Sequence, residues 1–304
     1  MCIRDRYHRY STFGNLGPLT RRIVLCSCKN LSKLDTENNL TTSAELLASF
    51  DPLLKPGQVV LIGEWHGTNE FPDLVGHLAT RCCRLGHSVT IAIEVACSEQ
   101  RPITEFVAAD SPGTEFLDGP WWHRSEEFQD GRSSQAVARL IHTAARLKGE
   151  GNDVFVAAVD GPWVAPGSPV DPLSLHLVEI PRDQVMAKFL LETMDERPRA
   201  TTFFLGGHDH ARVTPLIGNA QPAGRYVHMW HPKAISLLGR FSEGTAWTLD
   251  SQRKQGGIRA VTGDASLNAE AIWSPKPGED GHHGYVHVGT VSASEPFVGG
   301  TQLV

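Results

Sequence analysis

The stretch QVVLIGEWHGTNEF, residues 58–71, decides the fold of this chain. It opens with an apolar run that stops at a glycine, and it then presents Glu64 and His66 before a helical pattern begins near Glu70. A strand that ends in reactive side chains and leads into a helix is typical of α/β proteins, which bind ligands beyond the carboxyl ends of their strands. We therefore expect the rest of the chain to supply partners for Glu64 and His66.

The spacing of Glu64 and His66 indicates a joint role. The two residues are two positions apart, so in an extended segment their side chains point to the same side. A carboxylate beside an imidazole orients the ring and raises its basicity, which suits the activation of a water molecule. The alternative is that Glu64 only accepts backbone N–H bonds in the turn.

Three further apolar runs resemble the first, because each ends at ionisable residues. They are SVTIAIE (88–94), ending in Glu94; DVFVAAVD (153–160), ending in Asp160; and ATTFFLGG (200–207), followed by His208 and His210. Helical patterns separate the runs, over about residues 70–85, 99–109 and 135–148 and from Arg182 onward. Such crossovers indicate parallel strands. We predict an α/β fold with a mostly parallel sheet flanked by helices, and a site where the four strand ends meet.

The C-terminal part has a different pattern, with short apolar runs between Gly- and Pro-rich segments. Predicted strands are RYVHMW (225–230), ISLLGRF (235–241), TAWTL (245–249) and GYVHVGTV (284–291), which together form a C-terminal β-rich extension. We predict a single α/β domain over residues 41–304. Residues 1–40 open with the basic run MCIRDRYHRY and are predicted to be a poorly ordered or non-native segment.

The charged residues near the strand ends have structural alternatives. Glu94 ends a very apolar run, so its burial is costly unless it is paired, and a structural salt bridge with Arg182 or Arg132 would pair it. Asp160 could equally cap the following turn. Asp183 suits the dipole in the first turn of its helix, whereas Arg182 does not, so Arg182 is expected to have another role.

His208 and His210 repeat the spacing of Glu64 and His66, and the glycines before them allow close approach of the backbone. Exposure to solvent without a role is the alternative for both histidines. Residues 110–133 form a predicted loop of the length often found in binding or lid loops. Its Trp121 and Trp122 either line a pocket or cover the core.

Composition and motifs exclude several classes of protein. The net charge of −6 gives no electrostatic footprint for nucleic acid. No apolar run approaches the roughly 18–20 residues that cross a bilayer. The spacing of the six cysteines is a poor disulfide framework. HExxH, Walker A, GxSxG and a GxGxxG after a strand are all absent, which favours activated water or binding without chemistry.

Location and assembly are less constrained by the sequence. We expect a cytoplasmic protein, and the segment RRIVLCSC (21–28) makes a periplasmic protein or a lipoprotein the alternative. The expected partner is a small-molecule substrate, with no nucleic acid and no transmembrane segment, and the oligomeric state is left open.

Several segments carry a resemblance to a known group. They are LIGEWHGTNEF (61–71), IAIE (91–94), QDGRSS (129–134), RDQVMA (182–187), GGHDHA (206–211), FSEGTAWTL (241–249) and YVHVGTVSASEPF (285–297). With these segments in this order over about residues 55–297, the chain resembles the erythromycin esterase-like and ChaN-like superfamily, which is related to the TraB/Tiki proteins.

The resemblance to the erythromycin esterase-like enzymes implies a metal-independent hydrolytic site. It implies Glu64 as an orienting carboxylate and His66 as the base on the attacking water, with Glu94 and Arg182 shaping the site. His210 matches the histidine of the group's usual Gly-Asn-x-His-Ala. The predicted catalytic residues are Glu64, His66, Glu94, Arg182 and His210. The predicted substrate-binding residues are Trp121, Trp122, Asp130, Arg132, Asp160, Asp183 and His208.

The same superfamily implies an alternative function. ChaN-like members bind haem, and Tiki-type members are metal-dependent proteases. His208 stands where the group usually has an asparagine, and this extra imidazole favours a metal. The resemblance to the esterases and the meeting of the strand ends favour, as the predicted function, hydrolysis of an ester or amide of a small molecule with no cofactor required. The alternative is a haem- or divalent-metal-binding protein without hydrolytic activity.

Overall fold

The computed structural model describes residues 43–109, 113–125, 128–164, 172–216, 218, 220–250, 252 and 255–297. The predicted poorly ordered or non-native segment, residues 1–40, lies outside this part of the chain, as does some of the predicted loop at 110–133. Within the described ranges, no helix is long and apolar enough to cross a membrane.

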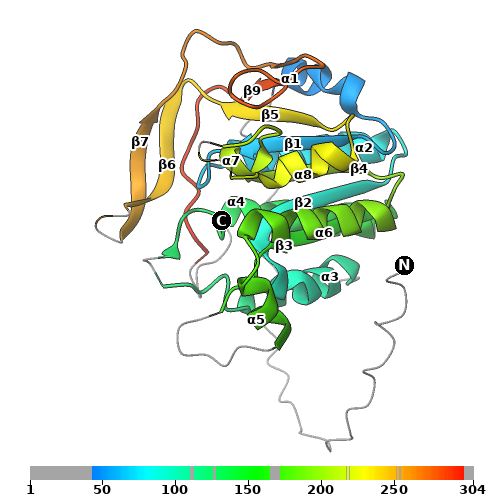
Figure 1. Ribbon diagram of the computed structural model, residues 1–304, viewed down its shortest axis with the longest axis vertical. Helices are drawn as coiled ribbons and strands as arrows, with labels where there is room; N and C mark the ends of the chain where they lie inside the picture. The colour runs from blue at the N-terminus through cyan, green and yellow to red at the C-terminus, as the bar shows by residue number, and fades with distance from the viewer. Residues whose placement is uncertain are drawn as a thin grey trace, which may run out of the picture. The chain divides into compact units, whose positions relative to one another are not determined.

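A seven-stranded sheet in the order β3-β2-β4-β1-β5-β9-β8 forms the framework (Figure 1). Its strands are β1 (Val59–Glu64), β2 (Val89–Ala96), β3 (Val154–Asp160), β4 (Thr201–Gly207), β5 (Ile235–Arg240), β8 (Ala271–Trp273) and β9 (Gly284–His287). Every pairing in this sheet is parallel except that of β8 with β9. The predicted fold class, a mostly parallel sheet flanked by helices, is confirmed.

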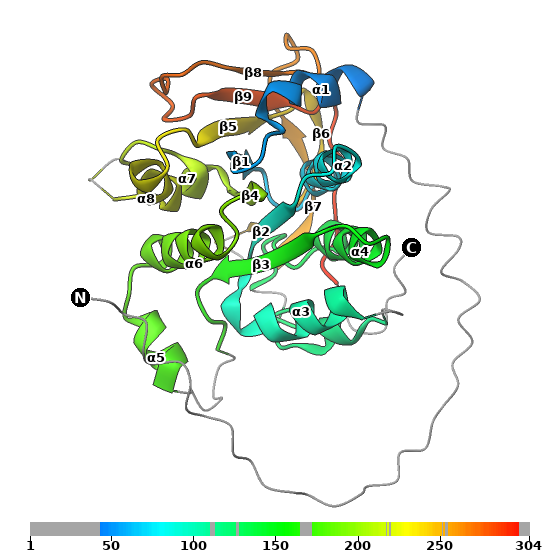
Figure 2. The ribbon, with the colours of Figure 1, turned by 90° about the vertical axis from the view of Figure 1, so that its right-hand side faces the viewer.

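Helices cover both faces of the sheet (Figure 2). One face packs against α2 (Glu70–Arg84), α3 (Gln100–Ala108) and α4 (Gln135–Gly149), and the other against α6 (Arg182–Glu196), α7 (His208–Ala211) and α8 (Ala223–Trp230). The shorter elements are α1 (Ala44–Ser49), α5 (Pro172–Val178), η2 (Asp51–Leu53), η3 (Cys97–Glu99) and η4 (Glu115–Asp118). Because both faces are covered, β1, β2 and β4 are buried along their whole length.

Local sequence signals account for where the helices begin and how they face. The Ser43 hydroxyl accepts the Leu46 N–H at 3.1 Å and caps α1. The Ser134 hydroxyl accepts the Val137 N–H at 3.4 Å and caps α4. The apolar side chains of α2 that recur at helical spacing are all buried: Phe71, Leu74, Val75, Leu78 and Cys82.

The C-terminal part differs from the prediction in one element. RYVHMW was expected to be a strand, but it belongs to helix α8, which Pro222 precedes. Ala223 and Val227 lie one helical turn apart and are both buried in the apolar cluster that covers one face of the sheet. A run of only six residues fits both the two-residue period of a strand and the 3.6-residue period of a helix. The sequence pattern therefore could not distinguish a strand from a helix here.

The β-rich extension has two parts, and that prediction is confirmed. Strands β5, β9 and β8 extend the main sheet beyond β1. Strands β6 (Glu243–Asp250) and β7 (Gln255–Thr262) form a separate antiparallel hairpin, drawn on the left of Figure 1. The predicted strand at 284–291 is shorter than expected, because β9 ends at His287.

Residues 291–297, which we call the C-terminal strap, connect the loops after β1 and before α4. The strap's Ser294 N–H donates to the Gly67 carbonyl at 2.8 Å, and its Phe297 N–H donates to the Ser133 carbonyl at 2.9 Å. The Trp247 N–H of the hairpin also donates to the Gly67 carbonyl, at 2.8 Å. The loops that begin with GEWHG and QDGRSS are therefore held by backbone hydrogen bonds from distant parts of the chain.

Candidate active site

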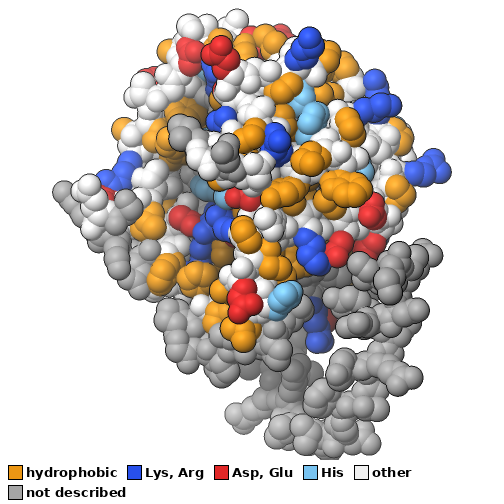
Figure 3. Space-filling view, viewed as in Figure 1, with side chains coloured by type: hydrophobic (Ala, Val, Ile, Leu, Met, Phe, Trp, Pro, Cys, Tyr) orange, Lys and Arg blue, Asp and Glu red, His pale blue; other side chains and the backbone are white. Residues whose placement is uncertain are grey.

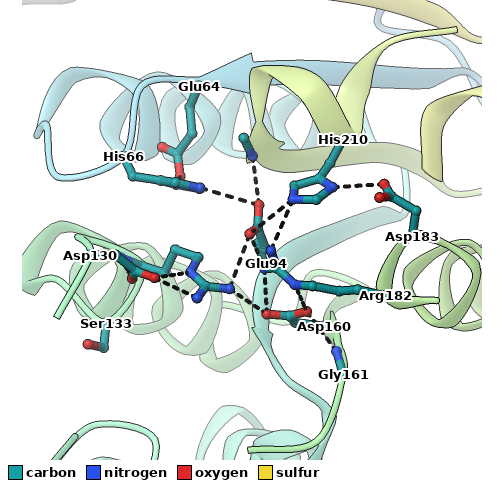
Figure 4. A network of polar contacts seen from close by, with 12 residues as sticks. Glu64, His66, Glu94, Asp130, Ser133, Asp160, Gly161, Arg182, Asp183 and His210 are labelled. Carbon is teal, nitrogen blue, oxygen red and sulfur yellow. Dashed lines mark hydrogen bonds and ion pairs between the residues drawn. The ribbon is translucent and has the colours of Figure 1, made fainter. Parts of the chain in front are cut away.

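The carboxyl ends of β1 to β4 meet at one edge of the sheet. In the strand register, Glu64 of β1 is opposite Gly207 of β4. Asp160 of β3 is opposite Ala96 of β2, two residues beyond Glu94. The expected side chains therefore converge from four strands that are distant in sequence, as Figure 4 shows for Glu64, Glu94 and Asp160.

Glu94 lies at the centre of the network and is 4% exposed. One carboxylate oxygen accepts the Gly207 N–H at 2.7 Å. The other accepts hydrogen bonds from the guanidinium groups of Arg182 and, at 3.3 Å, Arg132. Burial opposes ionisation of Glu94, but its contacts with His66 and the charge of Arg132 outweigh this effect and hold its pKa well below the ordinary value.

Two further carboxylates complete this network. Asp160 accepts hydrogen bonds from Arg132 and Arg182, each at 2.7 Å, and also from the Gly161 N–H. Asp130 accepts a hydrogen bond from Arg132 Nε at 2.8 Å. Burial opposes ionisation of Asp130, but Arg132 and Arg124 lower its pKa to about 2. We call Glu94, Asp130, Arg132, Asp160 and Arg182 the ion wall.

His66 lies between two carboxylates and is 23% exposed at its side chain. Its Nδ1 is 2.8 Å from Glu64 Oε1, and its Nε2 is 3.4 Å from Glu94 Oε2. Burial disfavours the imidazolium, but Glu94 and Glu64 outweigh that effect and raise the pKa of His66 to about 10. Both ring nitrogens face groups that only accept, so the resting site favours a doubly protonated ring.

Two glycines are required by the packing around His66. Gly67 has φ +76°, and a Cβ there would also collide with the backbone of Trp247. A Cβ on Gly207 would lie 3.0 Å from His66 Nε2. Gly67 therefore lets the hairpin backbone approach the segment just after His66, and Gly207 lets β4 approach the imidazole.

His210 is held by its neighbours in a defined tautomer. Its Nε2 lies 3.1 Å from a guanidinium nitrogen of Arg182, which can only donate. Its Nδ1 lies 2.7 Å from Asp183 Oδ1, which also accepts the Ala223 N–H at 2.8 Å. The network therefore assigns the ring proton of His210 to Nδ1 and uses its Nε2 lone pair to position Arg182.

His208 does not join this network, contrary to the expectation that it would face Glu64 and His66 with His210. Its side chain is 52% exposed and lies 3.5 Å from Asp209. The expectation assumed an extended segment, in which residues two apart share a side, but His208 and His210 lie on helix α7. On a helix, residues two apart do not face the same way. His208 still contributes to the wall of the cavity beside His66.

The two predicted tryptophans are both buried and differ in position. Trp121 packs under the guanidinium of Arg124, whose central carbon is 3.8 Å from the ring centroid. Trp121 also lines a cavity of about 220 Å³ on the Asp160 side of the ion wall. Trp122 is fully buried against Phe116, with ring centroids 5.6 Å apart, so we leave it out of the proposed site.

A cavity of about 420 Å³ lies over the network, within the range typical of small-molecule sites. Its lining includes Glu64, His66, Glu94, Asp130, Arg132, Arg182 and His210. Figure 3 shows acidic, basic and histidine side chains gathered on this face of the molecule, left of centre. Trp65 and three hairpin residues, Trp247, Thr248 and Leu249, also line it. Sequence reasoning missed the three hairpin residues, because no local pattern indicates that the hairpin reaches the strand ends, and it gave no role to Trp65 although that residue lies between Glu64 and His66.

The donor atoms of the site are engaged with one another. In the described part of the chain, no group of three or more His, Cys, Asp or Glu side chains has a geometry suited to a metal ion. Haem or divalent-metal binding stays a prediction, which elemental analysis and haem titration of the purified protein would test.

The fold is similar to several solved structures at low sequence identity. A Bacillus cereus protein is 11% identical, with 84% of this chain and 94% of that chain covered and a TM-score of 0.57. A succinoglycan biosynthesis protein is 10% identical, with 81% and 92% covered and a TM-score of 0.54. The erythromycin esterase EreC, solved as a mutant in its open conformation, is 13% identical, with 80% and 93% covered and a TM-score of 0.51.

At this identity the likeness concerns the fold alone. The erythromycin esterase-like fold expected from the sequence is therefore confirmed, while the ChaN-like and TraB/Tiki part stays a prediction. No protein-family model and no curated protein matches the sequence.

Proposed function

We propose that this chain is a hydrolase that uses Glu64 and His66 to activate water against an ester or amide of a small molecule. The observation that carries the proposal is the Glu64–His66–Glu94 arrangement in the wall of the 420 Å³ cavity. Similarity of the fold to that of an erythromycin esterase supports it.

His66 acts as the general base in this proposal, and its pKa sets the pH at which it can do so. At pH 7 a group with a pKa of about 10 holds its proton, and removing that proton costs about 4 kcal/mol. The rate constant kcat/KM should therefore rise about tenfold per pH unit and level off near pH 10. A rate that instead falls above about pH 9 would assign His66 as a proton donor and contradict its role as base.

Arg182 is the proposed electrophilic group. It makes four hydrogen bonds, two to Asp160, one to Glu94 and one to His210, and a guanidinium has five N–H groups. We assign the remaining Nη1–H to the oxyanion that develops when water attacks the carbonyl carbon. The ion wall then serves to fix the direction of this donor.

The test is a pair of substitutions, His66→Ala and His210→Ala. Loss of the base in the first variant, and misplacement of Arg182 in the second, should each lower turnover of a chromogenic ester or amide by roughly 100- to 10,000-fold. His176→Ala, an exposed histidine on α5, is the matched control and should keep full activity. Thermal melting shows whether each variant is folded, and wild-type turnover in both folded variants would overturn the proposal.

A further inference from the structure

We infer that a second cavity beside Glu64 receives an uncharged apolar arm of the substrate, an inference that rests on the proposed function. This cavity, which we call the side alcove, has a volume of about 340 Å³. Its walls come from the ends of β1 and β5 and from the end of the hairpin strand β7, and they include Trp65, Leu238, Phe241 and Thr262.

The side alcove and the main cavity share three residues of their walls: Glu64, Trp65 and His208. A ligand whose reacting carbonyl lies beside His66 can therefore extend past Trp65 into the side alcove. The Glu64–His66 pair lies at the boundary between the two spaces, where a scissile bond with substituents on both sides would be placed.

The aromatic walls give the side alcove its preference for apolar groups. Trp65 is 43% exposed, which is high for so large an apolar side chain at the edge of a cavity. It contacts the buried Phe241 edge to face, with ring centroids 5.8 Å apart. A ligand group packed against Trp65 would remove apolar surface from water on both itself and the protein.

Charge at the rim is already paired, which favours an uncharged arm. Arg240 lies 3.8 Å from a carboxylate oxygen of Asp264 and 3.9 Å from one of Asp280. A charged ligand group would have to compete with these pairs and lose hydration in the apolar part of the alcove. At about 30 Å³ per small group, the volume corresponds to an alkyl or aryl arm of roughly ten heavy atoms.

The experiment measures hydrolysis of two series: ethyl esters of linear acids with about two to eight carbons, and acetates of alcohols of the same lengths. In at least one series kcat/KM should rise about fourfold per added methylene, the factor that burial of one CH₂ supplies. Thr262→Trp puts an indole at the alcove wall, and it should lower the ratio of long-chain to short-chain kcat/KM at least tenfold. Gln255→Trp adds the same group at the other end of β7 and should keep the wild-type ratio.

An unchanged ratio in Thr262→Trp would overturn the inference. If the wild-type protein hydrolyses no ester of either series and none of the corresponding amides, the proposed function fails separately, and binding of 1-octanol by calorimetry tests the side alcove alone. Weaker octanol binding by Thr262→Trp than by Gln255→Trp would then support the side alcove as an apolar site. Equal binding by the two variants would overturn it.

Discussion

The ion wall and the Glu64–Trp65–His66 segment form opposite sides of one cavity, and they use their polar groups differently. In the wall, both oxygens of Glu94, of Asp130 and of Asp160 accept hydrogen bonds from arginine side chains, backbone N–H groups or His66. The other side carries a histidine with a strongly raised pKa and an exposed tryptophan. The wall's carboxylates therefore hold geometry and leave one Arg182 N–H for a ligand, while His66 and Trp65 present the other groups available to it.

His66 connects the two sides, because it faces Glu64 on one and Glu94 on the other. Its pKa is raised from 6.5 to about 10, so the folded protein keeps a proton that the unfolded chain releases above pH 6.5. The resulting stability is fully present below about pH 6.5 and is lost as the pH rises through about 10. We expect the free energy of unfolding to fall over this window by up to about 5 kcal/mol.

Urea unfolding at a series of pH values measures this loss. His66→Ala should remove the part of the slope that His66 causes, so its stability should depend less on pH between about 6.5 and 10. Equal slopes in the two proteins would show that the carboxylates do not hold a proton on His66, and the distinction between the two sides of the cavity would fail.

Arg132→Met tests the wall itself. Arg132 is 16% exposed and bonds Asp130, Glu94 and Asp160, so its loss leaves three carboxylates with fewer partners. Breaking a buried ion network in this way costs about 3–5 kcal/mol of unfolding free energy. Arg101→Met is the matched control, because Arg101 is 87% exposed and pairs only with Glu105 in the described contacts. The control should have the melting temperature of the wild type. An Arg132→Met variant with the wild-type melting temperature would mean that the wall does not stabilise the fold.

The meeting of the strand ends could be predicted because its signals are local. Each apolar run, its terminal Glu94 or Asp160 and the following helix can be recognised within about 20 residues, and parallel strands place their carboxyl ends at one edge. The opposite orientations of His208 and His210 could not be predicted, because α7 is four residues long and gives no periodic signal. The sequence therefore indicated where the polar residues gather, while their roles in catalysis stay predictions.

No local sequence pattern predicts that the hairpin and the C-terminal strap cover the site. Trp247 Nε1 donates to the Gln129 carbonyl across 118 positions of sequence, and the strap bonds Gly67 from residue 294. Such contacts depend on how the hairpin and the strap pass over the sheet edge. Neither the spacing of apolar residues nor the composition indicates that path, so the hairpin residues entered the site only with the structure.

The smallest expected effect concerns a buried serine that fixes the position of α7, and with it His210. The Ser236 hydroxyl donates to the carbonyl of Ala211, the last residue of α7, at 2.7 Å. With its only proton used, it accepts from His282 Nδ1 at 2.7 Å, and burial keeps His282 neutral by lowering its pKa to about 4. Ser236→Ala removes the hydrogen bonds that the Ala211 carbonyl and His282 Nδ1 make with the hydroxyl, at a cost of about 1–3 kcal/mol of unfolding free energy.

Turnover should respond to the same substitution, because α7 carries the His210 that positions Arg182. We expect Ser236→Ala to lower kcat several-fold with little change in KM, since Ser236 does not line the main cavity. Ser274→Ala is the matched control, because Ser274 is exposed and its hydroxyl bonds only the nearby Lys276 carbonyl in the described contacts. If Ser236→Ala is destabilised but keeps the wild-type kcat, the position of α7 does not limit the chemistry, and the ion wall alone sets the direction of Arg182.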